Sequence, residues 1–254
     1  MTKLSEPKSH DFNRRQTLQI LAGTTITAAF AKGLSAQTAG KETDMEIAAF
    51  VYTELQISVP FTDVPWQVLS DRINAQPGFI NKTWLAGHGN NSVGGFYAFD
   101  SIENAQKFVT GYFPGEASSF SVAHTTRIFP AAPVRDASAD MNSPHFGAAP
   151  ERKPGAFVYT ELQVNVPFEN APWRDRNPVL REQTGLISKN WLSGLNTQTL
   201  GGLDAFDTVE NAVEFAVNVF PKTAEKMNTA LYTRVFDANI TEEASRYLRS
   251  PYYS

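Results

Sequence analysis

Hydrophobic and polar positions alternate along residues 49–59. Val51 and Leu55 share one side of the chain, and Tyr52 and Glu54 share the other. A period of two that is rich in β-branched and aromatic residues is typical of a β-strand. The same kind of pattern, bounded by turn residues, predicts three further strands, over 80–85, 93–99 and 125–129.

Two helices are predicted between these strands. Pro65 suits a first helical turn, and Pro77-Gly78 ends the segment, which predicts a helix over 65–75. Asp100 followed by Glu103 has the spacing of a capping box and predicts a second helix with Asp100 as its N-cap. The order strand, helix, strand, strand, helix, strand indicates a ferredoxin-like α+β domain with both helices on one face of an antiparallel sheet.

The whole unit occurs twice. Residues 50–130 recur without a gap at 157–237, and 35 of the 81 aligned positions are identical. The run FVYTELQ, for example, begins both copies. A displacement of 107 positions indicates a repeated domain, since solenoid motifs repeat roughly every 20–50 residues.

The bare face of each sheet predicts how the copies pack. A repeat of about 80 residues has little core of its own, so we expect the two sheets to cover each other as a pseudo-dimeric α/β barrel. The expected segments are a first repeat at 47–131, a linker at 132–154, a second repeat at 155–238 and a C-terminal tail at 239–254. The Ala, Pro, Ser and Asp content of the linker predicts no packed element, although Met141 and His145-Phe146 allow part of it to dock. We expect the tail to lie as a helix on the surface.

The N-terminal segment has the character of an export signal. Arg14-Arg15 precedes a mildly apolar run over 18–31 and resembles a twin-arginine signal, with Thr17 where that signal usually has phenylalanine. The run is shorter than the roughly 20 residues that span a bilayer. We therefore expect residues 1–36 to be a signal peptide, cleaved after Ala31 or Ala36, and the mature protein to be periplasmic with no membrane segment.

Composition and charge exclude several classes of function. A net charge of -4 argues against an electrostatic nucleic-acid binder. The absence of cysteine excludes disulfides, thiolate metal sites and a cysteine nucleophile. No HExxH, paired histidines or G-x-S-x-G occurs, so we expect neither a metal site nor a serine-hydrolase elbow. Gly94-Gly95 lacks a phosphate-loop context and is expected to relieve crowding or form a bulge.

Two motifs carry a resemblance to a known family. The runs QPGFINKTW at 76–84 and GGFYAFD at 94–100 return as TGLISKNW at 184–191 and GGLDAFD at 201–207. They resemble the small mono-oxygenases of the dimeric α/β-barrel superfamily, relatives of the antibiotic-biosynthesis and quinol mono-oxygenases. Members are usually homodimers of one domain, so the resemblance implies that one chain stands for one dimer, as a monomer or within a homo-oligomer.

The resemblance also implies a chemistry. The better-studied relatives oxidise electron-rich phenols or quinols with dioxygen, without metal or flavin; the protein supplies a dry pocket and a base. It therefore implies a cofactor-independent enzyme. Because other members of the superfamily bind or degrade haem, haem and flavin stay open, as does a non-catalytic periplasmic binding protein for a hydrophobic ligand or haem.

Charged residues common to both copies are candidates for the site. Glu54 and Arg127 recur as Glu161 and Arg234. The first and fourth strands of a ferredoxin-like sheet are neighbours, so we expect Glu54 to meet Arg127, either as a base and anion site or as a structural ion pair between the sheets. Lys82 recurs in the same way as Lys189.

Histidine occurs in the first copy only. His88 and His124 align with Leu195 and Leu231. Because histidine titrates near neutral pH, His124, which opens a strand beside the second helix, is the expected base for deprotonating a phenol. In that case only the first repeat is active and the second is a scaffold. The predicted catalytic residues are His124, Glu54 and Arg127.

Aromatic side chains complete the prediction. Trp84 and Trp191 either stack on an aromatic substrate or fill the core. Tyr97 aligns with Asp204, which indicates either divergent pockets or drift on an exposed face. The predicted substrate-binding residues are Tyr52, Trp84, Phe96, Tyr97, Tyr159, Glu161, Trp191, Asp204 and Arg234.

Overall fold

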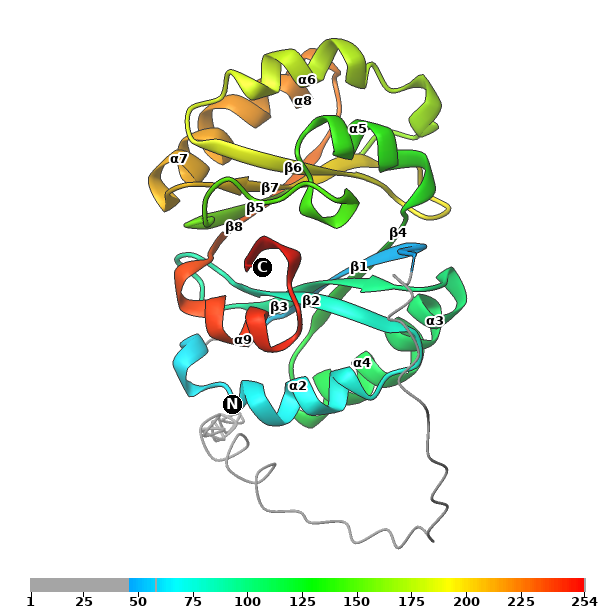
Figure 1. The fold of residues 1–254 in the computed structure, drawn as a ribbon, viewed down its shortest axis with the longest axis vertical. Helices are drawn as coiled ribbons and strands as arrows, with labels where there is room; N and C mark the ends of the chain where they lie inside the picture. The colour runs from blue at the N-terminus through cyan, green and yellow to red at the C-terminus, as the bar shows by residue number, and fades with distance from the viewer. Residues whose placement is uncertain (1–45, 58, 254) are drawn as a thin grey trace, which may run out of the picture. The chain divides into compact units, whose positions relative to one another are not determined.

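Two four-stranded antiparallel sheets form the frame of the protein (Figure 1). The structure is a computed structural model that describes residues 46–57 and 59–253; the predicted signal peptide lies outside these residues. The first sheet has the order β2-β3-β1-β4 and the second the order β6-β7-β5-β8. This is the strand order of two ferredoxin-like repeats, which confirms the predicted fold class. The strands are β1 (Ala49–Leu55), β2 (Phe79–Ala86), β3 (Val93–Phe99), β4 (His124–Pro130), β5 (Ala156–Leu162), β6 (Leu186–Ser193), β7 (Leu200–Phe206) and β8 (Leu231–Asp237).

The helices of each repeat cover the outer face of its own sheet (Figure 1). In both repeats the second helix contains a π-helical turn, followed by a proline that has no N–H to donate within the helix. The helices are α2 (Trp66–Asn74), α3 (Ile102–Lys107), α4 (Phe113–Ser119), α6 (Trp173–Arg181), α7 (Val209–Glu214) and α8 (Phe220–Lys226), with π-helical turns η2 (Phe108–Tyr112) and η6 (Phe215–Val219). None of the helices in the described part of the chain is long and apolar enough to span a bilayer.

The start of the second helix differs from the prediction by one residue. Ser101, not Asp100, is the N-cap of α3, and its Oγ accepts from the Asn104 N–H at 3.2 Å. Asp100 Oδ1 instead accepts from the Asn104 side-chain amide at 2.8 Å. Thr208 caps α7 in the same way. The hydroxyl residue takes the cap because its backbone is already extended there.

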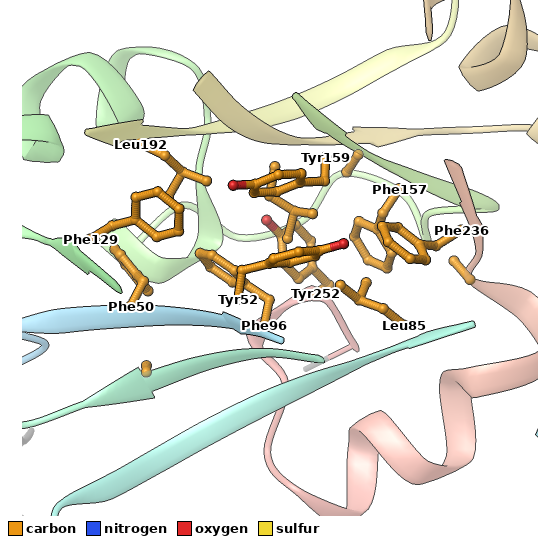
Figure 2. Close-up of a cluster of buried hydrophobic side chains, with 14 of the residues drawn as sticks. Phe50, Tyr52, Leu85, Phe96, Phe129, Phe157, Tyr159, Leu192, Phe236 and Tyr252 are labelled. Atoms are coloured by element: carbon orange, nitrogen blue, oxygen red, sulfur yellow. The ribbon is translucent and has the colours of Figure 1, made fainter. Parts of the chain in front are cut away.

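The inner faces of the two sheets pack against each other (Figure 2). Tyr52 and Tyr159 stack at the centre, with ring centroids 4.0 Å apart and planes 9° from parallel. Phe50, Phe96 and Phe157 are fully buried in the same cluster. The burial of each bare face by the other repeat is therefore as expected for a pseudo-dimeric barrel.

Main-chain contacts close the barrel at its edges. The Leu195 N–H donates to the Ile128 carbonyl at 2.8 Å, and the His88 N–H donates to the Val235 carbonyl at 2.8 Å. Each turn after a second strand thus meets the fourth strand of the other repeat, and these bonds satisfy backbone groups at the edges of the sheets.

The segment after each repeat packs on the other repeat. We call residues 132–146 and 239–253 the exchanged arms; they contain α5 (Arg135–Asp140) and α9 (Glu242–Tyr247). The Ser138 Oγ accepts from the Trp191 N–H at 2.9 Å, and the Ser245 Oγ accepts from the Trp84 N–H at 2.9 Å. The expectation that residues 132–154 contain no packed element is therefore wrong for their first half, because α5 forms there and Ser138 binds the edge strand β6.

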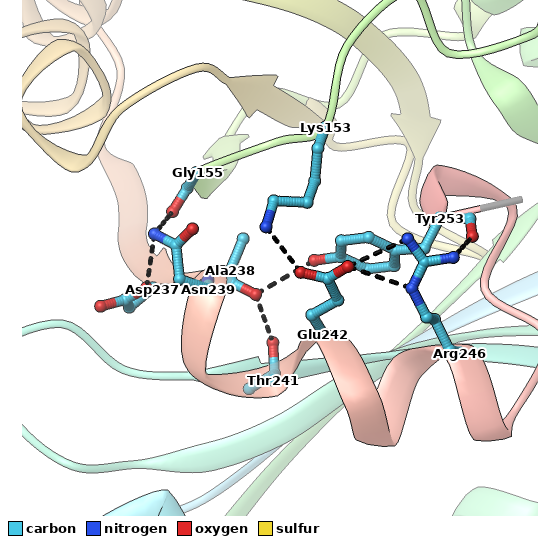
Figure 3. A network of polar contacts seen from close by, with 9 residues as sticks. All are labelled: Lys153, Gly155, Asp237, Ala238, Asn239, Thr241, Glu242, Arg246 and Tyr253. Carbon is cyan, nitrogen blue, oxygen red and sulfur yellow. Dashed lines mark hydrogen bonds and ion pairs between the residues drawn. The ribbon is translucent and has the colours of Figure 1, made fainter.

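The second exchanged arm also ends between the sheets rather than on the surface. Tyr252 and Tyr253 are buried in the central cluster. Figure 3 shows the polar network that holds this arm: Glu242 accepts from Lys153 Nζ at 2.7 Å and from Arg246 Nε at 3.0 Å, and the Tyr253 hydroxyl donates to the Ala238 carbonyl at 3.2 Å.

Candidate functional site

A cavity of about 270 Å³ lies in the second repeat, between the sheet and helices α6 and α8. Its walls are largely apolar and come from three helical segments and three strands. The apolar lining includes Leu162, Leu180, Phe215, Val219, Phe220 and Met227. Lys189 also lines it, and its Nζ forms an ion pair with the Asp204 carboxylate at 2.8 Å. Both side chains are almost completely buried, at 5% and 0% exposure, so this charged pair lies deep in an apolar space.

The sheet register places this pair. Lys189 on β6 lies directly opposite Asp204 on β7. A Cβ atom on Gly202 would lie 2.2 Å from Lys189 Nζ, so a side chain there would displace the end of the lysine from its present position. A Cβ on Gly201 would lie 2.0 Å from the Thr160 carbonyl oxygen. The paired glycines therefore relieve crowding, one of the two roles expected from the sequence.

Burial sets the electrostatics of the pair. Loss of hydration raises the pKa of the Asp204 carboxyl above its usual range, while the Lys189 ammonium acts in the opposite direction. Thr160 Oγ1 donates to Asp204 at 3.4 Å. The Trp191 ring also lines the cavity, with its centroid 4.6 Å from Lys189 Nζ, and its Nε1 donates to Asn177 at 2.9 Å. A buried carboxyl whose pKa is raised, beside an ammonium, suits proton transfer from a bound hydroxyl.

Larger side chains occupy the corresponding positions in the first repeat. Tyr97, Tyr112 and Glu116 stand there at the positions of Asp204, Val219 and Thr223. The Tyr97 and Tyr112 rings pack on either side of Phe108, at centroid distances of 4.9 Å and 5.3 Å. The Tyr112 hydroxyl donates to Glu116 at 3.0 Å.

The lysine of the first repeat is enclosed by this packing. Lys82 Nζ lies 2.8 Å from the centroid of the Trp84 ring. Burial lowers the pKa of Lys82 well below its usual range, although Glu116 opposes the shift. The two repeats thus keep one fold but present different lysine environments.

The predicted partnership of Glu54 and Arg127 is wrong. Glu54 contacts Arg234 Nε at 3.4 Å, and Glu161 contacts Arg127 Nε at 3.5 Å, so both ion pairs run between the repeats. In the register of the first sheet Arg127 lies opposite Tyr52 rather than Glu54, and the facing sheet supplies the nearer arginine. This is the structural alternative considered above, an ion pair between the sheets.

Tyrosine hydroxyls join both of these carboxylates to the central cluster. Glu54 accepts from the Tyr52 hydroxyl at 3.0 Å and from the Tyr232 hydroxyl at 2.8 Å. Glu161 accepts from the Tyr159 hydroxyl at 2.6 Å. Tyr52, Tyr159, Glu161 and Arg234, which were predicted to bind substrate, therefore belong to the contact between the sheets.

A second hollow, of about 770 Å³, lies where the repeats meet and is lined in part by Arg127, Glu161 and Gln163. It is wide and open to solvent. The Lys189 cavity is the better candidate site, because apolar walls exclude water and strengthen electrostatic interactions with a bound molecule.

The histidines lie elsewhere. His88 and His124 are exposed, and neither lines the Lys189 cavity. The His124 ring contacts the edge of Phe113, with centroids 5.6 Å apart. The structure therefore does not bring His124, Glu54 and Arg127 together, and it places the cavity in the second repeat, not the first.

The remaining aromatic residues that were predicted to bind substrate fall into two groups, core residues and cavity residues. Trp84 is buried and its Nε1 donates to the Ser70 hydroxyl at 3.3 Å, so it is a core residue. Phe96 is packed between the sheets, and the Tyr97 ring packs against Phe108 on the helix side of the first sheet. Trp191 and Lys189 line the cavity, with Asp204 behind Lys189. Sequence reasoning missed the importance of Lys189; the change from Tyr97 to Asp204 at the facing position was the signal that could have found it.

The donor groups around the Lys189 cavity fit metals and haem poorly. No cluster of three His, Asp or Glu side chains suited to a metal ion is found in the described part of the chain. Of the described residues, those lining the cavity include no histidine or tyrosine, the common axial ligands of haem besides cysteine and methionine, and Met227 is half exposed at its edge. The cavity therefore does not fit a haem site of the usual kind.

Comparisons with solved structures find likenesses of low identity. An anthrone oxidase-like protein shares 12% identity at a TM-score of 0.49, over 75% of this chain and 90% of that chain. A putative monooxygenase from Lactobacillus acidophilus NCFM shares 7% identity at a TM-score of 0.38, over 75% of this chain and 93% of that chain. A chlorite dismutase from Candidatus Nitrospira defluvii shares 9% identity at a TM-score of 0.44, over 80% of this chain and 97% of that chain.

The sequence comparisons concern the first repeat. No curated protein sequence matches the chain. A family model does match, over residues 55–131, which extend from the end of β1 to the residue after β4. The family that this chain matches is that of the putative mono-oxygenase ydhR, through its first repeat.

Proposed function

We propose that this protein is a mono-oxygenase whose reaction takes place in the Lys189 cavity of the second repeat, on a small phenol or quinol. The observation that carries the proposal is the buried Lys189–Asp204 pair, with its N···O distance of 2.8 Å, on the wall of a largely apolar cavity. The match to a mono-oxygenase family supports the reaction class. The larger side chains at the corresponding positions of the first repeat support a site in the second repeat.

The first step is deprotonation of the substrate. Lys189 Nζ passes a proton to the Asp204 carboxylate and takes one from the substrate hydroxyl, so Lys189 stays an ammonium and the substrate becomes a phenolate. The raised pKa of Asp204, caused by burial, favours this transfer. The ammonium beside the new oxyanion stabilises its charge in a site with little water.

The phenolate then reduces dioxygen. One oxygen atom enters the ring and the other leaves as water, so that one phenol and one dioxygen give one quinone and one water. The substrate supplies all the electrons, and no external reductant is consumed. The role of this chain's residues is to hold the anion, exclude water and transfer the proton.

Oxygen uptake tests the proposal. Mature protein is assayed in an oxygen electrode with a panel of phenols and hydroquinones, and Lys189→Gln is expected to lower kcat/KM by about 10²-fold or more. Lys82→Gln is the matched control, because it changes the aligned lysine of the first repeat. Its rate should equal that of the unchanged protein, with thermal melts showing that both variants are folded.

Three outcomes would overturn this proposal. Equal loss of rate in both variants would mean that the cavity of the second repeat is not the site. Saturable binding of the phenols with no oxygen uptake would favour a non-catalytic binding protein. A haem or flavin band in the absorption spectrum of the purified protein would replace the cofactor-free chemistry.

Export is part of the same proposal. The paired residues Arg14-Arg15 and the apolar run over 18–31 support delivery to the periplasm by a twin-arginine-like signal. Cell fractionation should find the mature chain in the periplasm, and Arg14→Lys with Arg15→Lys should leave the precursor in the cytoplasm.

A further inference from the structure

The rim of the Lys189 cavity is basic. Arg176 on α6 and Lys222 and Lys226 on α8 line it together with Lys189. Of the described residues that line the cavity, none is acidic. In a chain with a net charge of -4, this is a local concentration of positive charge around an apolar space.

These rim cations have no carboxylate partner of their own. None of Arg176, Lys222 and Lys226 forms an ion pair with any residue in the described part of the chain. Arg176 Nη2 donates to the Thr223 hydroxyl at 3.4 Å, which ties α6 to α8 across the cavity. Arg176 is partly buried, whereas Lys222 and Lys226 are exposed. The cations are therefore available to an anion bound at the rim.

The first repeat offers an internal comparison. The positions of Arg176, Lys222 and Lys226 are held there by Leu69, Gly115 and Ser119. These three cations are therefore specific to the second repeat. The first repeat has a different arrangement on the same helix: Arg72 aligns with the cavity residue Val179 and acts electrostatically on Glu116.

We infer that the cavity takes an amphipathic monoanion: an aromatic molecule whose ring enters between α6 and α8 and whose carboxylate or sulfonate stays at the rim beside Lys222 and Lys226. This inference rests on the proposed function and refines its substrate to a phenol or quinol that carries an acidic group away from the reacting hydroxyl. Lys189 then meets the hydroxyl and the rim cations meet the acid. Apolar walls provide affinity, and the rim charges provide selectivity and orientation.

A pair of fluorescent probes with one aromatic skeleton tests this. Mature protein is titrated with the anion 8-anilinonaphthalene-1-sulfonate and with the neutral N-phenyl-1-naphthylamine. We expect the sulfonate to bind about five- to tenfold more tightly, with the preference falling in about 0.5 M salt because the rim charges are screened.

Two variants test which residues bind the probes and which cause the preference for the sulfonate. Lys222→Gln combined with Lys226→Gln should remove the preference for the sulfonate and leave the neutral probe unchanged; both side chains are exposed, so folding should be preserved. Val219→Tyr places in the cavity the residue that stands at this position in the first repeat, and its larger side chain should weaken binding of both probes.

The outcomes separate this inference from the proposed function. Equal affinity for the two probes, a preference that survives the double lysine variant, or unchanged affinity of both probes for Val219→Tyr would overturn the inference while leaving oxygen uptake by neutral phenols intact. A preference that behaves as expected, without oxygen uptake, would overturn the mono-oxygenase and leave an anion-binding cavity.

Discussion

At the scale of single residues, three substitutions distinguish the surroundings of the two lysines. Asp204, Val219 and Thr223 belong to the repeat with the Lys189 cavity, and the larger Tyr97, Tyr112 and Glu116 stand at the same positions in the first repeat. The lysine itself is common to both copies, and so is the glycine beside it. Both repeats thus keep the charged group, while the volume of the side chains around it differs.

One buried residue outside the site makes stability depend on pH. His145, on the first exchanged arm, packs against Phe50, Phe96 and Tyr252, and its ring nitrogens have no hydrogen-bond partner in the described part of the chain. Burial lowers the pKa of His145 to about 3. The unfolded chain accepts a proton near pH 6.5 and the folded chain does not, so acid favours unfolding between those values.

We expect His145→Phe to remove this dependence. As pH falls from about 6.5 to 4, the free energy of unfolding of the unchanged protein should drop by about 1.4 kcal/mol per pH unit more than that of the variant. Urea unfolding at a series of pH values measures the difference. Parallel pH profiles for the two proteins would show that the folded protein protonates His145 as readily as the unfolded chain.

At the scale of elements, the exchanged arms protect the outer edges of the sheets. β2 and β6 are edge strands, whose unpaired N–H groups would otherwise meet solvent or another chain. The Lys82 N–H donates to the Leu248 carbonyl and the Lys189 N–H to the Met141 carbonyl, both at 3.0 Å. Each arm therefore covers the edge strand that carries the lysine of the other repeat.

The serine contacts of the arms should be worth similar amounts. Ser245→Ala leaves the Trp84 N–H unpaired in a buried place, and Ser138→Ala does the same to the Trp191 N–H. We expect each to lower the free energy of unfolding by about 1–3 kcal/mol. Ser118→Ala, at an exposed position of α4, is the control and should change it by less than about 0.5 kcal/mol. Urea unfolding measures all three variants. An unchanged free energy of unfolding for Ser245→Ala would show that this contact of the arm does not stabilise the protein.

At the scale of the whole molecule, the central aromatic cluster and the crossed ion pairs make the repeats depend on each other. Tyr52 stacks on Tyr159, and Glu54 and Glu161 each contact an arginine of the other repeat. A repeat on its own would expose this face and lose the arm that covers its edge strand.

A fragment of residues 46–154 should consequently have no stable folded monomer. Any folded form should be a dimer whose urea midpoint rises with protein concentration, because association and folding are then linked. Circular dichroism and size-exclusion chromatography at several concentrations measure this. A monomer whose midpoint does not change with concentration would contradict the mutual dependence of the repeats.

The sequence by itself determined the strands, the duplication, the ferredoxin-like order and the packing of the bare faces. These follow from local backbone preferences and from the period of hydrophobic positions, which are properties of neighbouring residues. The sequence also indicates that the arms belong to the repeat. The displacement of 107 positions continues into them, through Ser138 and Ser245 and through Ser143 and Ser250.

Only the tertiary structure decided the rest. It paired Glu54 with Arg234 instead of Arg127, placed the first arm on β6, and opened the cavity beside Lys189 rather than around His124. The physical reason is the same each time. Ion-pair partners and cavities depend on how side chains from distant segments meet, and their volumes and charges can be compared only once those segments share a space.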